Sequence, residues 1–140
     1  MDFDSELNKI SFIHGEADLE EMYDFIDSLE KLPNQREAIP SIFKFIEDNF
    51  DKYLGSPGPL VHFLEQKNDY IEELEASIER KPTGHTVWMI NRIINGGTVN
   101  QQEFWLSKLI GVLNMPGVDS ETKKSAEELV DYQSKEAQQS

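Results

Sequence analysis

Three histidines, His14, His62 and His85, are the first side chains to consider for chemistry, because imidazole serves both as a general base and as a metal ligand. His62 has Glu65 one turn further along the chain, a spacing that would place two ligands on one helix face. A metal site needs at least one further set of ligands, and the paired Glu-x-x-His motifs of di-iron bundles are absent from this sequence. No Ser or Asp at a recognisable spacing supports nucleophilic catalysis at His85. We therefore expect no catalytic residue, no metal and no cofactor.

The glycine-rich segments do not have the pattern of a phosphate-binding loop. Gly55-Ser56-Pro57-Gly58 lacks a preceding strand and a following Lys-Ser or Lys-Thr, and Gly96-Gly97 lies between predicted helices. The chain contains no cysteine, which excludes thiolate nucleophiles, zinc ribbons and redox switches. Its 27 acidic residues are so numerous that pairs at acid–base spacing arise by chance. These observations favour a protein that is not an enzyme.

The carboxylates give the chain a formal net charge of −14, and they are concentrated near its N-terminus. Residues 1–31 contain ten acids and only two lysines, Lys9 and Lys31. Such a field repels nucleic acids and anionic membranes, and it accelerates encounter with a basic protein. An acidic surface can also serve only to keep a protein in solution. We expect a protein partner, and we expect neither nucleic acid nor membrane binding.

The N-terminal residues MDFDSELNK carry acids where a secretory signal peptide would carry cations, and no apolar segment follows them. The longest apolar-rich run is interrupted by Asn91, Arg92 and Asn95, so no segment has the composition of a membrane span. We therefore expect a cytoplasmic protein.

Hydrophobic periodicity predicts helices along most of the chain, separated by proline and glycine breakers. The expected segments are a short helix within 1–15, followed by helices over about 19–32, 39–54, 60–66, 69–80, 85–95, 101–114 and 119–132. Asp18 is predicted to cap the helix over 19–32, and both Thr98-x-x-Gln101 and Asn100-x-x-Glu103 fit a capping signature for the helix over 101–114. The expected fold is all-α: one domain, residues 1–140, of about six to seven short antiparallel helices in a bundle or a short stack of helix pairs. Residues 134–140 are expected to form a frayed tail.

The stretch Pro82–Val118 contrasts with the rest of the chain because it is rich in apolar residues and contains a single acid. A helix over 85–95 without a clean polar face is usually covered on several sides, so we expect Trp88 to be buried. In that interpretation Asn95 caps the helix and Arg92 pairs with an acid. The alternative is that Trp88 and Arg92, which are one turn apart, lie on the rim of an interface, where Trp and Arg are frequent anchors.

Outward-facing carboxylates on two predicted helices are the other candidates for contact with a partner. On helix 19–32 three acids fall opposite the apolar face, and helix 69–80 carries three more on its outer side. Together with the tryptophan and arginine above, the candidate partner-binding residues are Glu20, Asp24, Asp27, Glu72, Glu75, Glu79, Trp88 and Arg92.

Three segments, LGSPGPLVHFLEQ, YIEELEASIERKPTGHTVWMINRIING and EFWLSKLIGVL, resemble small helical immunity proteins of bacterial polymorphic-toxin and contact-dependent growth inhibition systems. The likeness covers about residues 54–113, less than half of the chain. It implies a cytoplasmic antidote that binds one toxin domain, often a nuclease, and either covers its active site or locks it in an inactive state. Because a nuclease must be basic to hold phosphates, a carboxylate-rich surface can mimic that polyanion.

Three functions follow as expectations from these features. The first is an immunity protein that neutralises a cognate toxin, a basic nuclease domain, by one-to-one binding. The alternative is an acidic helical adaptor or regulatory module whose partner is not a toxin. A third, from a different class, is a small enzyme that uses His85 or His62.

Overall fold

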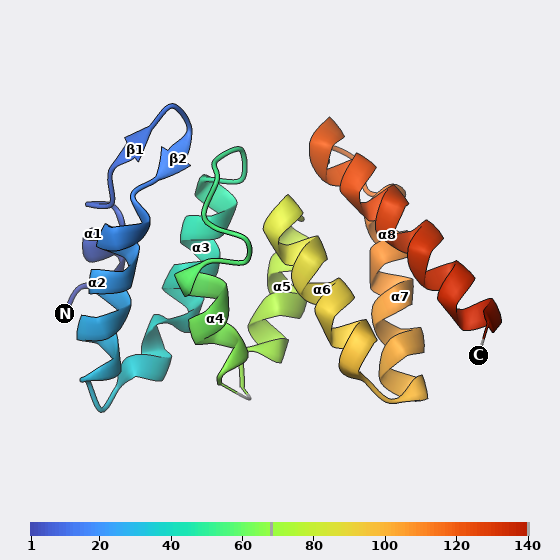
Figure 1. Ribbon diagram of the computed structural model, residues 1–140, viewed down its shortest axis with the longest axis horizontal. Coiled ribbons are helices and arrows are strands. Elements are labelled where there is room, and N and C mark those ends of the chain that lie inside the picture. The colour runs from blue at the N-terminus through green and yellow to red at the C-terminus, as the bar shows by residue number, and fades with distance from the viewer. Residues whose placement is uncertain (68, 140) are drawn as a thin grey trace. The chain divides into compact units, whose positions relative to one another are not determined.

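The computed structural model describes residues 1–67 and 69–139, and these residues are mostly helical (Figure 1). The chain folds as two compact units, Met1–Ala76 and Ser77–Ser140. The described residues contain eight α-helices, one 3-10 helix and one antiparallel sheet of two very short strands. The expected helical class is confirmed, although the helices outnumber the six to seven that we expected. No helix in the described part of the chain has the length and apolar character needed to cross a membrane.

The first unit is built from helices that pack α2 against α4 and α1 against both α3 and α2. Its elements are α1 (Phe3–Leu7), β1 (Phe12–Ile13), β2 (Glu16–Ala17), α2 (Leu19–Glu30), the 3-10 helix η1 (Gln35–Ala38), α3 (Ile39–Asp48), α4 (Pro59–Glu65) and the first part of α5 (Ile71–Arg80). Large side chains with almost no exposed surface form its core. They include Met22, Leu29, Ile42, Phe43, Phe63 and Leu64.

A hairpin, Phe12–Ala17, begins within the last part of the segment 1–15, where the sequence predicted only a short helix. Helix α1 ends at Leu7, and in the hairpin Ile13 pairs with Glu16, which leaves His14 and Gly15 as a two-residue loop. Both loop residues have positive φ, 52° and 78°, as a type I′ turn requires. The strands are too short to give an alternating hydrophobic pattern, which explains why periodicity did not reveal them.

Helix α3 ends at Asp48, earlier than the predicted end near Leu54. The chain after it pairs with the hairpin at Tyr53, whose backbone N–H donates to Gly15 O at 2.8 Å and whose carbonyl accepts from Ala17 N at 2.9 Å. These two hydrogen bonds add a third short segment to the hairpin. Pairing between distant parts of the chain has therefore replaced the last turn or more of the predicted helix.

Helix α2 begins where the sequence predicted, because Asp18 caps it. The Asp18 carboxylate accepts a hydrogen bond of 3.1 Å from the backbone N–H of Glu21, which satisfies one of the unpaired donors of the first turn. The helix buries Met22, Phe25 and other apolar side chains on one face. Its opposite face is exposed along its whole length.

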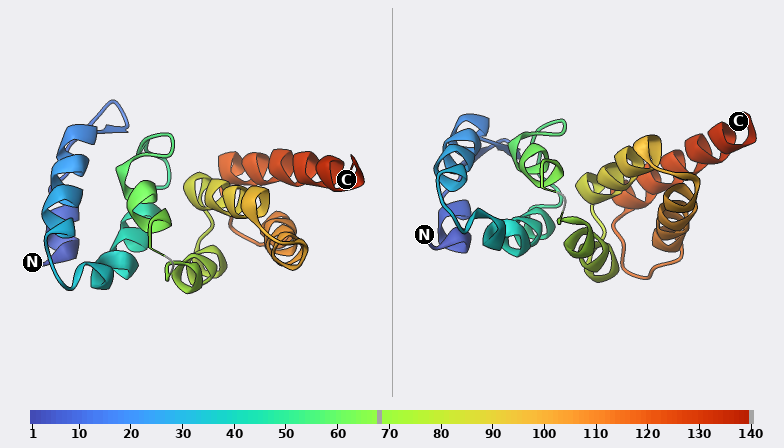
Figure 2. Two further views of the ribbon diagram at one scale, coloured as in Figure 1. Left: turned by 60° about the horizontal axis from the view of Figure 1, so that its bottom comes forward. Right: turned by 90° about the horizontal axis from the view of Figure 1, so that it is seen from below.

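The second unit contains α6 (Gly84–Gly96), α7 (Val99–Leu113) and α8 (Ser120–Gln139), which all pack against one another; Figure 2 shows them from two further sides. Of the two candidate capping pairs, Thr98–Gln101 opens α7, with both of its reciprocal hydrogen bonds present. A second capping box, formed by the fully buried Thr83 and Thr86, opens α6 and was not predicted.

Helix α8 extends beyond Tyr132, where the sequence indicated its end, and continues to Gln139. It thus includes residues 134–139 of the segment expected to form a frayed tail, while Ser140 lies outside the described residues. Asn95 does not cap α6 as expected, because the helix continues to Gly96. Its side-chain oxygen instead accepts a hydrogen bond from Gln133 Nε2.

Candidate protein-interaction site

The three acids predicted on the outer face of α2 are all exposed, and we call Glu20, Asp24 and Asp27 the α2 stripe. They are spaced i, i+4 and i+7, so they follow one another along the side of the helix opposite Met22 and Phe25. None of the three carboxylates forms an ion pair or a hydrogen bond with any residue that the structure describes. The stripe is therefore a row of unpaired negative charges on a well-packed helix.

A groove of about 250 Å³ lies between α1 and α2, beside this stripe. We call it the α1–α2 groove. Its lining residues are Met1, Glu6, Lys9, Ile10, Glu21, Asp24, Phe25 and Ser28. Asp24 belongs to both the groove and the α2 stripe, so the two features form one continuous surface.

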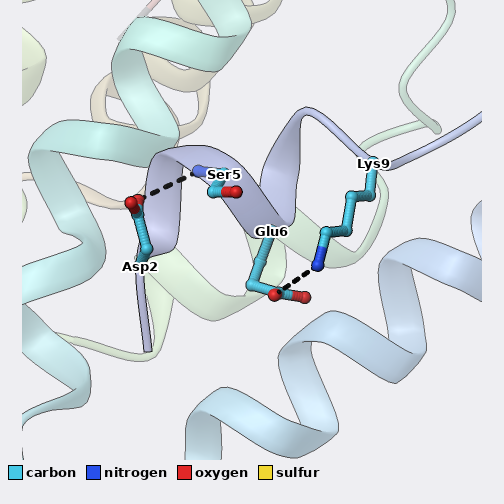
Figure 3. A network of polar contacts seen from close by, with 4 residues as sticks. All are labelled: Asp2, Ser5, Glu6 and Lys9. Carbon is cyan, nitrogen blue, oxygen red and sulfur yellow. Dashed lines mark hydrogen bonds and ion pairs between the residues drawn. The ribbon is translucent and has the colours of Figure 1, made fainter.

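The polar contacts around the groove leave an excess of carboxylates. Lys9 Nζ lies 2.9 Å from Glu6 Oε1, and both side chains are substantially exposed (Figure 3). Glu21 Oε1 accepts a hydrogen bond of 2.9 Å from the backbone N–H of Ser11. The groove therefore combines three carboxylates, including that of Asp24, with one ammonium group among its lining side chains.

The predicted carboxylates of α5 differ from those of the stripe, because two of them already have partners. Glu79 lies 3.3 Å from Lys108 Nζ, and Glu75 is half-buried and also interacts within the chain. Of these three carboxylates, only that of Glu72 is exposed and makes no ion pair or hydrogen bond with a described residue. The face of α5 is thus a weaker candidate for contact with a partner than the face of α2.

Trp88 is 53% exposed, which overturns the expectation that it is buried. Helix α6 turns Val87, Ile90 and Ile94 towards the interior of its unit, and Trp88 projects from the opposite side together with the exposed Arg92. The indole of Trp105 on α7, which is 4% exposed, occupies the core instead. Trp88 and Arg92 are thus both exposed on one side of α6, and Arg92 also has an interaction within the chain.

The histidines lie on three different elements. His14 is at the exposed tip of the hairpin, His62 is on the exposed side of α4, and His85 is half-buried in the first turn of α6. Within residues 1–67 and 69–139 there is no group of three or more His, Asp or Glu side chains that could hold a metal ion. The three imidazoles are therefore spread over three elements.

Comparisons of the chain with protein-family models, with curated proteins and with solved structures find no match. The likeness to helical immunity proteins therefore stands on the three sequence segments alone. The candidate interaction residues must be judged on exposure, pairing and charge.

Proposed function

We propose that this chain is an immunity protein that binds a cognate toxin domain with a basic surface, a nuclease, and neutralises it by one-to-one occupancy. The observation that carries the proposal is the α2 stripe, in which Glu20, Asp24 and Asp27 are exposed and unpaired among the described residues. Carboxylates that are not compensated within their own protein attract a basic partner over long distances and fix its orientation on contact. In this proposal the protein acts in the cytoplasm and has no turnover of its own.

A stable complex needs contacts that contribute binding energy as well as charges that attract the partner. Trp88 and Arg92 are of the residue types that commonly make such contacts. Buried interface contacts of Trp and Arg commonly account for much of a binding energy, whereas exposed charges mainly set the association rate. The α2 stripe belongs to the first unit and the Trp88–Arg92 face to the second, so each is proposed as a contact surface in its own right. They fit an acidic adaptor without a toxin partner as well, which remains the alternative function.

The experiment that tests the proposal uses the toxin domain encoded next to this chain's reading frame. Co-expression should rescue growth, and protection should rise with the amount of this protein up to an equimolar ratio. Replacement of Glu20, Asp24 and Asp27 with lysine should slow association at low salt by about tenfold or more and weaken its salt dependence. Stopped-flow association with the purified domain measures both effects.

A matched control carries the same change in net charge at a different place. Glu127, Glu128 and Glu136 are exposed on α8 and unpaired among the described residues, so their replacement with lysine tests charge without touching the stripe. This control should slow association much less than the stripe variant. Equal rates for the two variants would remove the α2 stripe from the interface, and protection far below equimolar amounts would show a catalytic protein instead of an inhibitor.

A further inference from the structure

The α1–α2 groove already contains a long cationic side chain, that of Lys9. Its ammonium group lies 2.9 Å from Glu6 Oε1 (Figure 3). The Lys9 side chain keeps 68% of its surface exposed. Ion pairs this exposed to water are weak, because solvent screens them and the flexible side chain loses freedom to form them. Lys9 is thus a loosely held occupant that another cation could displace.

The lining of the groove combines apolar and acidic side chains. Ile10 and Phe25 are buried apolar residues of the lining, and Glu6, Glu21 and Asp24 are its acids. Asp24 is unpaired among the described residues, and Glu21 uses only one of its two oxygens, on the Ser11 N–H. The lining residues carry three carboxylates against two ammonium groups, the side chain of Lys9 and the α-amino group of Met1, so the groove retains a smaller excess of negative charge.

We propose that this groove binds an arginine side chain from a protein partner. The aliphatic part of arginine can lie on Ile10 and Phe25, as long charged side chains do on apolar surface. The planar guanidinium carries five N–H donors, enough to reach Asp24 and the free oxygen of Glu21 together. The inference deepens the proposed function by naming what the partner inserts beside the α2 stripe, and it depends on that function only for the partner's identity.

Lys9 acts in this proposal as an internal competitor for the same carboxylates. While it is paired with Glu6, it reduces the negative charge that an incoming guanidinium meets. Removal of its charge should therefore strengthen binding, although Lys9 is itself a lining residue of the groove. If the peptide were attracted only by the net charge of the protein, removal of the Lys9 charge would change the affinity no more than removal of another exposed lysine charge.

The test does not require the natural partner. Acetyl-Gly-Arg-Gly-amide is titrated into the ¹⁵N-labelled full chain, and amide shifts are followed by NMR, with the citrulline peptide as its neutral counterpart. The arginine peptide should produce saturable shifts at Glu6, Glu21, Asp24 and Ser28, and the citrulline peptide should not. Lys9→Gln should tighten binding about two- to fivefold, and Asp24→Asn should weaken it by a similar factor, as expected for gain or loss of one exposed charge interaction.

Two matched variants separate the groove from the general field of the protein. Lys31→Gln removes the same charge at the end of α2, and Asp27→Asn removes a carboxylate of the stripe, but neither residue lines the groove. Both should change the affinity less than their groove counterparts. All four positions are exposed, so the fold should persist, which circular dichroism checks.

Two results would overturn the proposal: equal effects of Lys9→Gln and Lys31→Gln, or shifts spread along the α2 stripe without a maximum at the groove. Failure of the groove proposal can be distinguished from failure of the proposed function. If the peptide does not bind the groove but the chain still neutralises its toxin, only this inference fails. If the peptide binds but no neighbouring toxin is neutralised, only the proposed function fails.

Discussion

Gln133 Nε2 on α8 donates a hydrogen bond of 2.6 Å to Asn91 Oδ1 on α6, and both side chains are buried. The same nitrogen also lies 2.8 Å from Asn95 Oδ1. A buried amide costs free energy unless its polar atoms are paired, so these contacts favour one register of α8 along α6. They involve the part of α8 beyond Tyr132, which the hydrophobic pattern alone would have left outside the fold.

Replacement of Gln133 with alanine should lower the free energy of unfolding by about 1–3 kcal/mol, because it leaves the buried Asn91 oxygen without its donor. Chemical denaturation of the purified chain measures the change. A double-mutant cycle with Asn91→Ala should give a coupling energy well above zero, since the two side chains share one hydrogen bond.

Glu136→Ala is the control, because Glu136 is exposed on the same helix and unpaired among the described residues. Its effect should stay within about 0.5 kcal/mol, as for most surface substitutions. If Gln133→Ala and Glu136→Ala destabilise the chain equally, the buried amide contact does not hold α8 in place.

Some helix starts were predictable from the sequence because a cap is a local structure. Asp18 and the pair Thr98–Gln101 lie within one turn of the N–H groups that they satisfy. Spacing alone did not decide between Thr98 and Asn100 at α7, and it did not reveal the Thr83–Thr86 box, whose third helical residue is Thr and not the usual Glu or Gln. The hairpin was not predictable in this way. Its turn depends on positive φ at His14 and Gly15, and its third segment at Tyr53 comes from far along the chain.

The candidate site was partly predictable for the same reason. Periodicity placed Glu20, Asp24 and Asp27 on one face of α2, and their exposure follows because α2 packs on its opposite side only. The groove escaped the sequence because it depends on where α1 lies beside α2. The exposure of Trp88 does not follow from its apolar sequence neighbours, because the other helices cover most of α6 but leave the side that carries Trp88 and Arg92 open.

The ion pair between Arg36 and Asp69 gives a prediction about pH. Arg36 Nη1 lies 2.8 Å from Asp69 Oδ1, and this hydrogen bond holds the pKa of the Asp69 carboxyl below its ordinary value of 3.8. A carboxyl whose pKa is lowered by folding adds stability above its unfolded pKa, and that stability disappears as pH falls through the folded pKa. Asp69→Asn should therefore melt at a slightly lower temperature than the parent at neutral pH.

The difference in melting temperature between the two proteins should vanish in strong acid, where Asp69 is protonated in both the folded and the unfolded parent. Thermal melts across this pH range provide the measurement, and the effect should be small because both side chains are exposed. Asp27→Asn serves as the comparison, since Asp27 is unpaired among the described residues and its removal should not lower the melting temperature. A difference for Asp69→Asn that persists unchanged in acid would show that the ion pair is not its cause.

The two tryptophans form a matched pair for the last prediction. Trp105, which is 4% exposed, should cost about 3–5 kcal/mol of stability when replaced with alanine, because its removal leaves a cavity in the core of its unit. Trp88, which is 53% exposed on α6, should cost less, about 1–2 kcal/mol, because about half of its surface stays in water in the folded chain. Chemical denaturation of the two variants measures this contrast.

Binding should show the opposite order for the two tryptophan variants, when each is compared at a temperature at which it is folded. Trp88→Ala should weaken the complex with the toxin domain by about 1–2 kcal/mol or more, as the loss of an aromatic interface anchor does. Arg92→Ala, one turn away on the same exposed face, should weaken it as well. If Trp88→Ala retains full affinity, this face of α6 takes no part in the interface, and recognition has to rest on the carboxylates of α2 and the groove beside them.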